Sequence, residues 1–458
     1  MDRSRWWSNR LLLALILLGA TALRLWGVGD WSLWEDEETS IYFSFHPHDK
    51  FSRTFPTFFV MLSYVYRYAG DYVLAGRYLS ILLGVVSLAL TYGLVTRHAG
   101  RFVALVATAV VAISPGHLFW SQSIRYYTLT LCVQLAATWL FLEGVSARRL
   151  SLVVCSIATL ALAATCHPSA VLLLPVFLGH ALILQFKQVG RRPAIGGVAM
   201  GVLGVALAVV LWHYHLWKIV AVGSRHTLSS ARDPLHVLVT GAVYFGLPAV
   251  CLAIVGAVQE SRRPKRDVFW FFVLLGMGMP AMLAGLAALD VVNVTYYYGL
   301  VSLVGVAVLA GYGVQECRRW PRWAQVSALV PSALCYVIML GAYFGPSYGD
   351  RPRWREASAH ILASRVSADS PIHAQVPGVI AFYLGVPPGE TMQHELVKKL
   401  PERPEPGTTG WVVIERRLIP EMLGTTLDGR CTLSALFPSH MLARDRTVAV
   451  YACPIDER

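Results

Sequence analysis

The chain has 458 residues, of which 55% are hydrophobic and only 14% are charged. Soluble globular domains contain about 45–50% apolar and about 25% charged residues, so this composition excludes a soluble protein, a disordered chain and a collagen-like fibre. The formal net charge of +12 would suit a nucleic-acid partner in a soluble protein. Here the basic residues fall between apolar runs, so we exclude nucleic acid and predict an α-helical polytopic membrane protein.

About eleven apolar runs are long enough to cross a bilayer, which takes about 20 apolar residues per helix. The runs cover residues 11–28, 73–96, 102–119, 125–143, 150–167, 168–186, 194–213, 236–258, 268–289, 296–315 and 323–344. We therefore predict about eleven transmembrane helices in a membrane domain of residues 1–345.

Alternate connections between the runs are rich in arginine and lysine, as the positive-inside rule requires of cytoplasmic loops. They hold Arg3, Arg5 and Arg10; Arg97 and Arg101; Arg148 and Arg149; Lys187, Arg191 and Arg192; Arg262, Arg263, Lys265 and Arg266; and Arg318, Arg319 and Arg322. This parity predicts an N-terminus inside and residues after Phe344 outside. A bacterial inner membrane, with these residues in the periplasm, is the expected location. A cleaved signal peptide over the first run is the alternative, but its removal would invert the loop bias at every later position.

Two segments after the first run are predicted to be helices that lie on the outer membrane surface. Residues 36–45 form the first of them. Residues 54–68 form the second, because they are apolar and aromatic but too short and too rich in tyrosine to span. Counting the second segment as a span would also break the alternation of basic loops.

From Tyr348 onward the composition becomes that of a water-soluble domain, and we assign residues 346–458 to a small extracytoplasmic α/β domain. Residues 354–364 are predicted to form a helix, and residues 410–414 and 447–451 to form strands. Cys431 and Cys453 flank candidate strands. The sequence leaves open whether these two cysteines form a disulfide or remain thiols.

Four consecutive carboxylates, Glu35 to Glu38, follow the first run. Trp31 and Trp34 lie close by and are typical of the membrane interface, so the carboxylates are expected near the lipid headgroups. A carboxylate fixed there could deprotonate a hydroxyl acceptor as a general base, or hold a divalent cation through its oxygens. The simpler interpretation is a solvated charge run that marks a loop.

Several cationic or ionisable side chains are predicted on the same side of the membrane as the carboxylates. They are Arg24, Arg53, Arg77, Arg125 beside Tyr126 and Tyr127, and His167. An arginine at the edge of the hydrocarbon is costly unless it snorkels to the interface or meets an anion. For any one of the arginines, the simpler interpretation is that the side chain snorkels to lipid phosphates. For His167, the simpler interpretation is a structural role at the end of a helix. Together they fit a phosphate-bearing lipid, because the guanidinium fork matches phosphate oxygens.

Several motifs resemble the GT-C superfamily of polyprenyl-phosphate-sugar glycosyltransferases, which includes protein O-mannosyltransferases, the lipid A aminoarabinose transferase and lipopolysaccharide-core glycosyltransferases. The similar segments are Leu23-Arg24, Ser32-Leu33-Trp34-Glu35-Asp36-Glu37, Arg77-Tyr-Leu-Ser, Ser114-Pro115, Trp120-Ser-Gln-Ser-Ile-Arg125-Tyr-Tyr and, more weakly, Arg351 to Ala357. The resemblance is strongest over residues 10–200. In that family the aspartate of the Asp-Glu pair in the first outer loop is the catalytic base, which implies this role for Asp36.

Two positions depart from the family pattern. Tyr296-Tyr-Tyr298 stands where many members carry an arginine that contacts the donor phosphate. Arg125 and Tyr126 occupy the region where some relatives have a second acidic residue, which disfavours the amino-sugar type of site.

The resemblance implies an inverting glycosyltransferase that moves a sugar from a polyprenyl-phosphate donor to a lipid, glycan or protein acceptor on the extracytoplasmic side, surrounded by membrane lipids. Asp36 would be the catalytic base, and Glu37 would orient Asp36 or join it in holding a divalent cation; no other cofactor is expected. The substrate-binding candidates are Arg24, Arg53, Arg77, Gln122, Arg125, Tyr126, His167 and Tyr297. A transporter or flippase of a lipid-linked saccharide is the competing class, and it predicts broken helices in two matching halves.

Overall fold

The structure is a computed structural model that describes residues 3–49, 52–53, 56–187, 233–262, 267–289, 294–364, 370–393, 397–399, 410–415, 431–441 and 444–453. By their internal contacts the residues divide into two compact units. Unit 1 contains Met1–Leu25, Ser80–Ser121 and Tyr126–Met339, and unit 2 contains Trp26–Leu79, Gln122–Arg125 and Leu340–Arg458. The expected domains, 1–345 and 346–458, stay a prediction.

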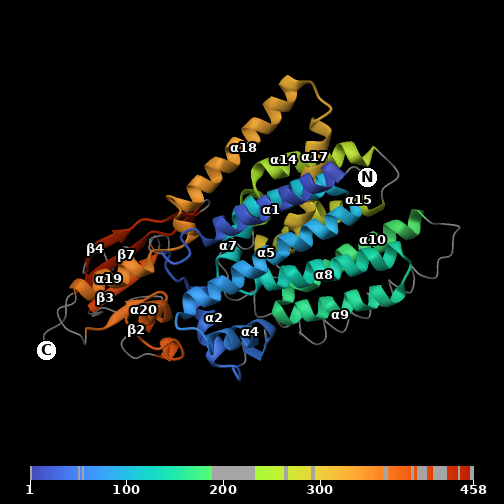
Figure 1. The fold of residues 1–458 in the computed structure, drawn as a ribbon. Coiled ribbons are helices and arrows are strands. Elements are labelled where there is room, and N and C mark those ends of the chain that lie inside the picture. Colours follow the sequence, from blue (N-terminus) through green and yellow to red (C-terminus); the bar gives the residue numbers. More distant parts are fainter. Residues whose placement is uncertain are drawn as a thin grey trace. The chain divides into compact units, whose positions relative to one another are not determined.

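Helices make up the described part of unit 1 (Figure 1). The α-helices that lie in it wholly or in part are α1 (Arg3–Leu25), α5 (Tyr72–His98), α6 (Arg101–Ile113), α7 (Pro115–Ser121), α8 (Tyr127–Ser146), α9 (Leu150–Cys166), α10 (Leu173–Lys187), α13 (Pro234–Phe245), α14 (Leu247–Ser261), α15 (Asp267–Val273), α16 (Met279–Ala288), α17 (Ser302–Cys317) and α18 (Arg322–Phe344). Short 3-10 turns η1 (Pro168–Leu172) and η4 (Tyr296–Gly299) and a π-helical turn η3 (Leu274–Gly278) join some of them. α8 packs against α9, and α14 packs against α17.

The chain is a multi-pass membrane protein. Five described helical stretches are long and apolar enough to cross a membrane: α5, α8, η1 with α10, α15 through α16, and α18. Two bent pairs, α6 with α7 (64°) and α13 with α14 (98°), raise the number to seven if each pair is one span. The predicted number of about eleven is not reached. α9 and α17 are apolar but short, and α1, which covers most of the first predicted span, is not among the candidate spans of the described residues. The predicted span 194–213 lies outside the described residues.

The two bends occur where the sequence interrupts regular helix. Pro115 begins α7, and a proline cannot donate the backbone hydrogen bond that would continue α6. Gly246 separates α13 from α14 with a φ of 102°, and a Cβ there would lie 2.4 Å from the Tyr336 hydroxyl. A residue other than glycine would therefore be strained and crowded at the sharper bend.

Unit 2 contains both helices that were predicted after the first run. α2 (Glu35–Phe45) and α4 (Pro56–Tyr66) pack against each other. Phe58, Phe59 and Leu62 of α4 are buried, which gives this short helix an apolar side packed within the protein. The helices are confirmed, and their place on the membrane surface stays a prediction.

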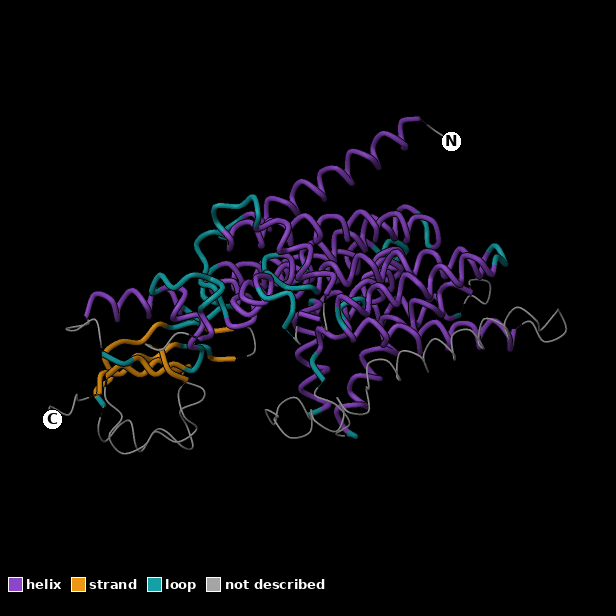
Figure 2. Tube along the Cα trace, turned by 90° about the horizontal axis from the view of Figure 1, so that it is seen from below, coloured by secondary structure: helices purple, strands orange, loops and turns teal. Residues whose placement is uncertain are grey.

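The C-terminal part of unit 2 is a small mixed sheet with helices, as predicted (Figure 1). The elements are η5 (Tyr348–Asp350), α19 (Trp354–Ser364), β1 (Ile372–Ala374), α20 (Pro377–Tyr383), η6 (Thr391–Gln393), β2 (Val397–Lys399), β3 (Gly410–Glu415), β4 (Thr432–Phe437), β5 (His440–Met441), β6 (Arg444–Asp445) and β7 (Val448–Cys453). The strands of the main sheet lie in the order β2-β1-β3-β7-β4; β1 is parallel to β2 and β3, and β7 is antiparallel to β3 and β4. Figure 2 shows the strands gathered together, in orange.

A disulfide joins Cys431 and Cys453, which resolves the pairing that the sequence leaves open. Both cysteines adjoin the core that Val412, Ile414 and Tyr451 form between β3 and β7. The predicted helix and both predicted strands of this region are confirmed as α19, β3 and β7. The disulfide links Cys453, the last residue of β7, to Cys431, the residue before β4.

Candidate active site

The four carboxylates of the acidic run form the first turn of α2, where the positive end of the helix dipole favours negative charge. Their surroundings differ sharply. Glu35 is exposed, the Asp36 side chain is 37% exposed, and Glu37 and Glu38 are 0% and 3% exposed. A run that reads as uniform in the sequence therefore contains two accessible and two buried carboxylates.

Asp36 lies beside Arg125, whose side chain is almost fully buried. The Arg125 Nη1 donates to the Asp36 carbonyl (3.1 Å) and to the Ser40 hydroxyl (3.2 Å). The Nη2 atom lies 3.8 Å from Asp36 Oδ2. The carboxylate is thus near a fixed positive charge while more than a third of its side chain faces solvent, an arrangement suited to accepting a proton from a bound hydroxyl.

Glu37 is an ion-pair centre. Arg77 binds it through two hydrogen bonds of 2.9 and 2.8 Å, and the Ile124 amide donates to Oε1 at 3.1 Å. Arg351 Nε lies 3.6 Å from Oε2. Burial raises the pKa of Glu37, but the charges of Arg77 and Arg351 and these hydrogen bonds outweigh it, so the pKa lies below its usual range.

Both oxygens of Glu37 are therefore engaged by donors of the chain itself. Across the described ranges, no group of three or more histidine, cysteine, aspartate or glutamate side chains is arranged to hold a metal ion. The two roles considered for Glu37, orienting Asp36 and binding a cation, stay predictions.

The N–H groups of Arg77 all donate hydrogen bonds to residues of unit 2. Besides the two bonds to Glu37, Nη1 donates to the carbonyls of Val28 (2.7 Å) and Trp31 (3.1 Å), and Nη2 donates to that of Ser32 (3.0 Å). A guanidinium has five N–H groups, so these bonds use its capacity. Arg77 thus holds the loop before α2, and in this arrangement it presents no N–H group to a ligand.

Glu38 is buried without an ion pair among the described residues. Its carboxylate accepts a hydrogen bond from the Thr391 hydroxyl, and a Cβ on Gly378 would lie within 2.7 Å of it. Burial raises the pKa of Glu38 to about 7, and the nearby Glu35 adds to the rise, although the Thr391 bond opposes it. The carboxyl is therefore partly protonated near neutral pH.

This shift predicts a pH-dependent stability. Between pH 4.5 and about 7 the folded chain holds a proton on Glu38 that the unfolded chain has released, so stability falls as the pH rises through this window. The full loss is about 3 kcal/mol, at about 1.4 kcal/mol per pKa unit. Glu38→Gln should remove this loss, so thermal unfolding in detergent at pH 5 and pH 8 should differ less in the variant. An equal pH effect in both proteins would contradict the assignment.

The other candidates in unit 2 have different surroundings. Gln122 is buried; its Oε1 accepts from the Tyr343 hydroxyl at 2.8 Å, and its Nε2 donates to the Trp26 carbonyl at 3.2 Å. Arg53 is exposed and donates from Nε to the His48 carbonyl at 2.9 Å. The Gln122 amide is therefore held by the chain's own atoms, whereas Arg53 is accessible.

Arg24 belongs to a buried polar cluster in unit 1. It donates to the carbonyls of Ala20 and Ala112, and Nη2 lies 2.6 Å from His117 Nδ1. Because a guanidinium can only donate hydrogen bonds, His117 Nδ1 must accept the bond from Arg24. The ring proton therefore lies on Nε2, which donates to the Ser87 hydroxyl at 2.8 Å. His117 was missed by the sequence analysis, since one histidine in an apolar run gives no distinctive signal.

Aromatic rings surround His167 in unit 1. Tyr126 stacks on the imidazole with ring centroids 4.7 Å apart and an angle of 16°, and Tyr298 lies 5.3 Å away. The His167 Nδ1 accepts a hydrogen bond from the Ser169 amide, so the His167 side chain caps the start of η1. Tyr297 contacts Tyr127 at 5.1 Å. The structure thus brings three of the predicted residues, Tyr126, His167 and Tyr297, into one continuous set of aromatic contacts.

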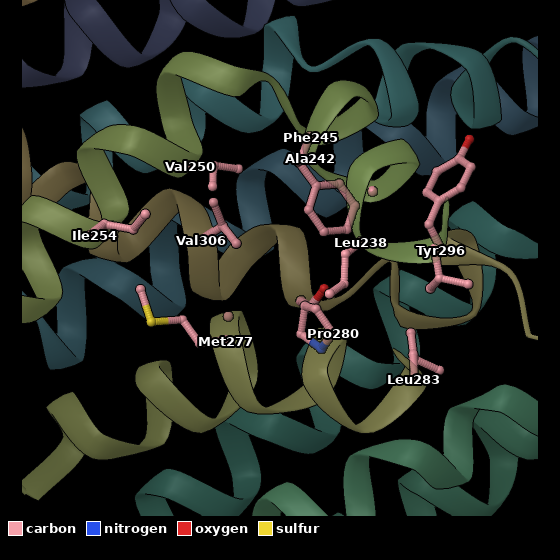
Figure 3. A pocket seen from close by; sticks show the side chains of 14 residues that line it. Leu238, Ala242, Phe245, Val250, Ile254, Met277, Pro280, Leu283, Tyr296 and Val306 are labelled. Atoms are coloured by element: carbon pink, nitrogen blue, oxygen red, sulfur yellow. The ribbon is translucent and has the colours of Figure 1, made fainter. Parts of the chain in front are cut away.

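An apolar pocket of about 340 Å³ lies in the same unit. Its lining comes from α13, α14, η3, α16, α17 and Tyr296, and includes Val237, Leu238, Phe245, Met277, Pro280 and Leu283 (Figure 3). Tyr296 also stacks on Tyr244 at 4.6 Å and contacts Tyr297 at 5.3 Å. The Tyr296–Tyr298 run therefore borders the apolar pocket at one end and the His167 aromatic cluster at the other.

Known proteins show similarity in sequence and in fold. Residues 46–215 match the family model described as dolichyl-phosphate-mannose-protein mannosyltransferase. The crystal structure of ArnT from Cupriavidus metallidurans bound to undecaprenyl phosphate aligns with a TM-score of 0.58 and 15% identity over 96% of this chain and 97% of that chain. Its apo structure aligns with a TM-score of 0.54 and 15% identity over 98% of each chain. No curated protein matches the chain in sequence.

Proposed function

We propose that this chain is a membrane glycosyltransferase of the GT-C superfamily and that it transfers a sugar from a polyprenyl-phosphate carrier to a hydroxyl group of a lipid, glycan or protein acceptor. The reaction would take place on the extracytoplasmic side of the membrane. The observation that carries the proposal is the pairing of Asp36, a half-exposed carboxylate, with the buried guanidinium of Arg125. The family match over residues 46–215 and the bound lipid of the ArnT structure support the choice of donor.

The reaction is a single displacement at the anomeric carbon. The acceptor oxygen attacks this carbon and forms the new glycosidic bond, while the bond from the carbon to the phosphate oxygen breaks. The bonding electrons leave with the polyprenyl phosphate, and the hydroxyl proton passes to the Asp36 carboxylate. One displacement inverts the configuration of the anomeric carbon.

Arg125 is assigned to the donor phosphate. Negative charge accumulates on that phosphate as the bond breaks, and a positive group held in place before the reaction stabilises it without reorganisation. The Arg125 side chain is about 5% exposed and is held by Asp36 and Ser40, so its position is fixed. Arg77 uses all five of its N–H groups in bonds to the chain's own atoms. Arg24 and Gln122 are also bonded within the chain, and we assign all three residues to the framework.

Tyr126, His167 and Tyr297 are the donor contacts proposed within unit 1. Their hydroxyl groups and imidazole offer hydrogen bonds, and their rings offer flat faces to a sugar. Of the three, Tyr297 lies in the run that stands where many relatives carry an arginine. Tyr126 stacks on His167, and Tyr127 links Tyr126 to Tyr297, so the three side chains belong to one set of aromatic contacts. Arg53 remains available to phosphate or acceptor because it is exposed.

Replacing Arg125 by alanine tests the proposed donor site. We expect Arg125→Ala to weaken binding of polyprenyl phosphate by about tenfold to a hundredfold, the usual worth of a charged hydrogen bond. Turnover should fall as well, because the contact strengthens in the transition state. Binding to purified protein in nanodiscs is the measurement. Arg319→Ala, which removes an exposed arginine paired with Glu316, is the matched control; equal affinities in the two variants would contradict the assignment.

The side of the membrane is tested by labelling introduced cysteines. We expect a membrane-impermeant maleimide to label Glu390→Cys from the outer side and Arg149→Cys from the inner side, because both positions are exposed and the basic loops face inward. Oriented vesicles of both polarities are compared, and the unmodified chain, with its own free cysteines, gives the background. Labelling of Glu390→Cys from the inner side would overturn the proposed orientation.

A further inference from the structure

Arg351 follows a strained turn in unit 2. Tyr348, Gly349 and Asp350 have φ values of 50°, 61° and 61°, a region that residues other than glycine rarely adopt. Gly349 lies against Trp31, since a Cβ there would come within 2.7 Å of the indole ring. Strain of this kind persists only where the surrounding contacts hold it, and Arg351 makes several of those contacts.

The guanidinium of Arg351 is fully buried and binds a turn more than two hundred residues earlier in the chain. Nη2 donates to the Gln122 carbonyl (2.9 Å) and to the Ser123 hydroxyl (2.8 Å), and Nη1 donates to the Gly349 carbonyl (2.8 Å). The guanidinium also lies over the Trp31 ring, 5.1 Å from its centroid. Arg351 therefore fixes residues 122–123 to the strained turn.

The same guanidinium reaches the buried carboxylate next to the proposed base. Arg351 Nε lies 3.6 Å from Glu37 Oε2, and the Ile124 amide donates to Glu37 Oε1 at 3.1 Å. Arg351, the turn at 122–124 and Glu37 thus form a closed ring of contacts. Arg77 also binds Glu37, so the charge of this carboxylate stays compensated if Arg351 is replaced.

The two members of the proposed catalytic pair are the next residues along the chain from this ring. Asp36 precedes Glu37, Arg125 follows Ile124, and Asp36 Oδ2 lies 3.8 Å from Arg125 Nη2. A displacement of the 122–124 turn would change that distance. We propose that Arg351 is a positioning residue that sets the separation of Asp36 and Arg125. This inference rests on the proposed function.

Arg351→Ala tests the inference. Turnover should fall about tenfold to a hundredfold, the effect expected of a misplacement of about 1 Å, and donor affinity should change less. Added guanidinium chloride at a non-denaturing concentration should restore part of the turnover by filling the vacated site. Arg351→Lys should recover little of the turnover lost in Arg351→Ala, because an ammonium group lacks the planar fork that reaches both Gln122 and Ser123. Arg353→Ala is the matched control, since that guanidinium lies over the Tyr348 ring at 4.7 Å, and it should not respond to guanidinium.

Each result has a distinct meaning. Turnover of Arg351→Ala within twofold of the wild type would overturn the positioning role and leave the proposed function intact. Lost turnover that guanidinium does not restore would show a purely structural role and overturn the inference as well. If the wild-type chain transferred no sugar under conditions in which it binds the donor, the proposed function would fall, and the inference with it.

Discussion

Asp36→Asn is expected to lower turnover by about two to four orders of magnitude, the usual contribution of general base catalysis. Asparagine keeps the size of the side chain and removes its ability to accept the acceptor's proton. Donor binding should survive, because losing a negative charge near a phosphate site does not add repulsion. The measurement is transfer from a labelled polyprenyl-phosphate sugar by purified protein in nanodiscs, with a crude lipid and glycan extract as acceptor.

Glu35→Gln is the matched control for this experiment. Glu35 lies in the same helical turn and is exposed, so its substitution removes one unit of charge from the same run without touching the proposed base. Glu38 is unsuited to this purpose because it is buried. Equal, modest losses in Asp36→Asn and Glu35→Gln would mean that the run acts through its electric field alone, and the base would have to lie elsewhere.

Arg77→Ala is expected to destabilise the fold by about 3–5 kcal/mol, the usual cost of removing one partner of a buried ion pair. Both Arg77 and Glu37 are 0% exposed, and the substitution also leaves the carbonyls of Val28 and Ser32 without their donor. Arg351 alone, 3.6 Å from Glu37, compensates the charge incompletely. Thermal unfolding in detergent is the measurement, with a large fall in midpoint as the expected result.

Arg53→Ala provides the comparison for Arg77. Arg53 lies in the same unit and is exposed, with one hydrogen bond to the nearby His48 carbonyl, so its loss should leave the unfolding midpoint almost unchanged. Similar midpoints for Arg77→Ala and Arg53→Ala would contradict the framework role of Arg77. That result would return Arg77 to the candidates for donor binding.

Much of the fold follows from local sequence patterns. Runs of apolar residues predict most of the described helices, since a backbone in lipid must satisfy its own hydrogen bonds. The strands β3 and β7 and the helix α19 also follow from local patterns. The bends at Pro115 and Gly246 are harder to predict. A glycine or proline inside an apolar run can either bend the helix or leave it nearly straight.

The site is less predictable because its residues come from distant segments. The motif that contains Asp36 identifies the acidic run, but the buried surroundings of Glu37 and Glu38 depend on contacts with Arg77, Arg351 and Thr391. These contacts join positions up to 353 residues apart, so no local pattern of hydrophobic and polar residues can predict them. For the same reason Arg24 and Arg77 read as anion-binding arginines in the sequence and are held by the chain's own oxygens in the structure.

The competing interpretation, a transporter or flippase of a lipid-linked saccharide, also accounts for a lipid-phosphate site in a membrane protein. It requires movement of the intact donor across the membrane, whereas the proposed reaction breaks the bond between sugar and phosphate. The pairing of Asp36 with Arg125 in the described part of unit 2 is suited to that bond cleavage. The fate of the donor therefore separates the two interpretations.

The most direct measurement follows both halves of a doubly labelled polyprenyl-phosphate sugar after it is bound by the purified chain in vesicles. We expect that adding the acceptor extract releases free polyprenyl phosphate and transfers an equal amount of labelled sugar to the acceptor, and that Asp36→Asn binds the donor but does neither. Movement of the intact donor across the vesicle membrane, without acceptor-dependent cleavage, would contradict the proposed function.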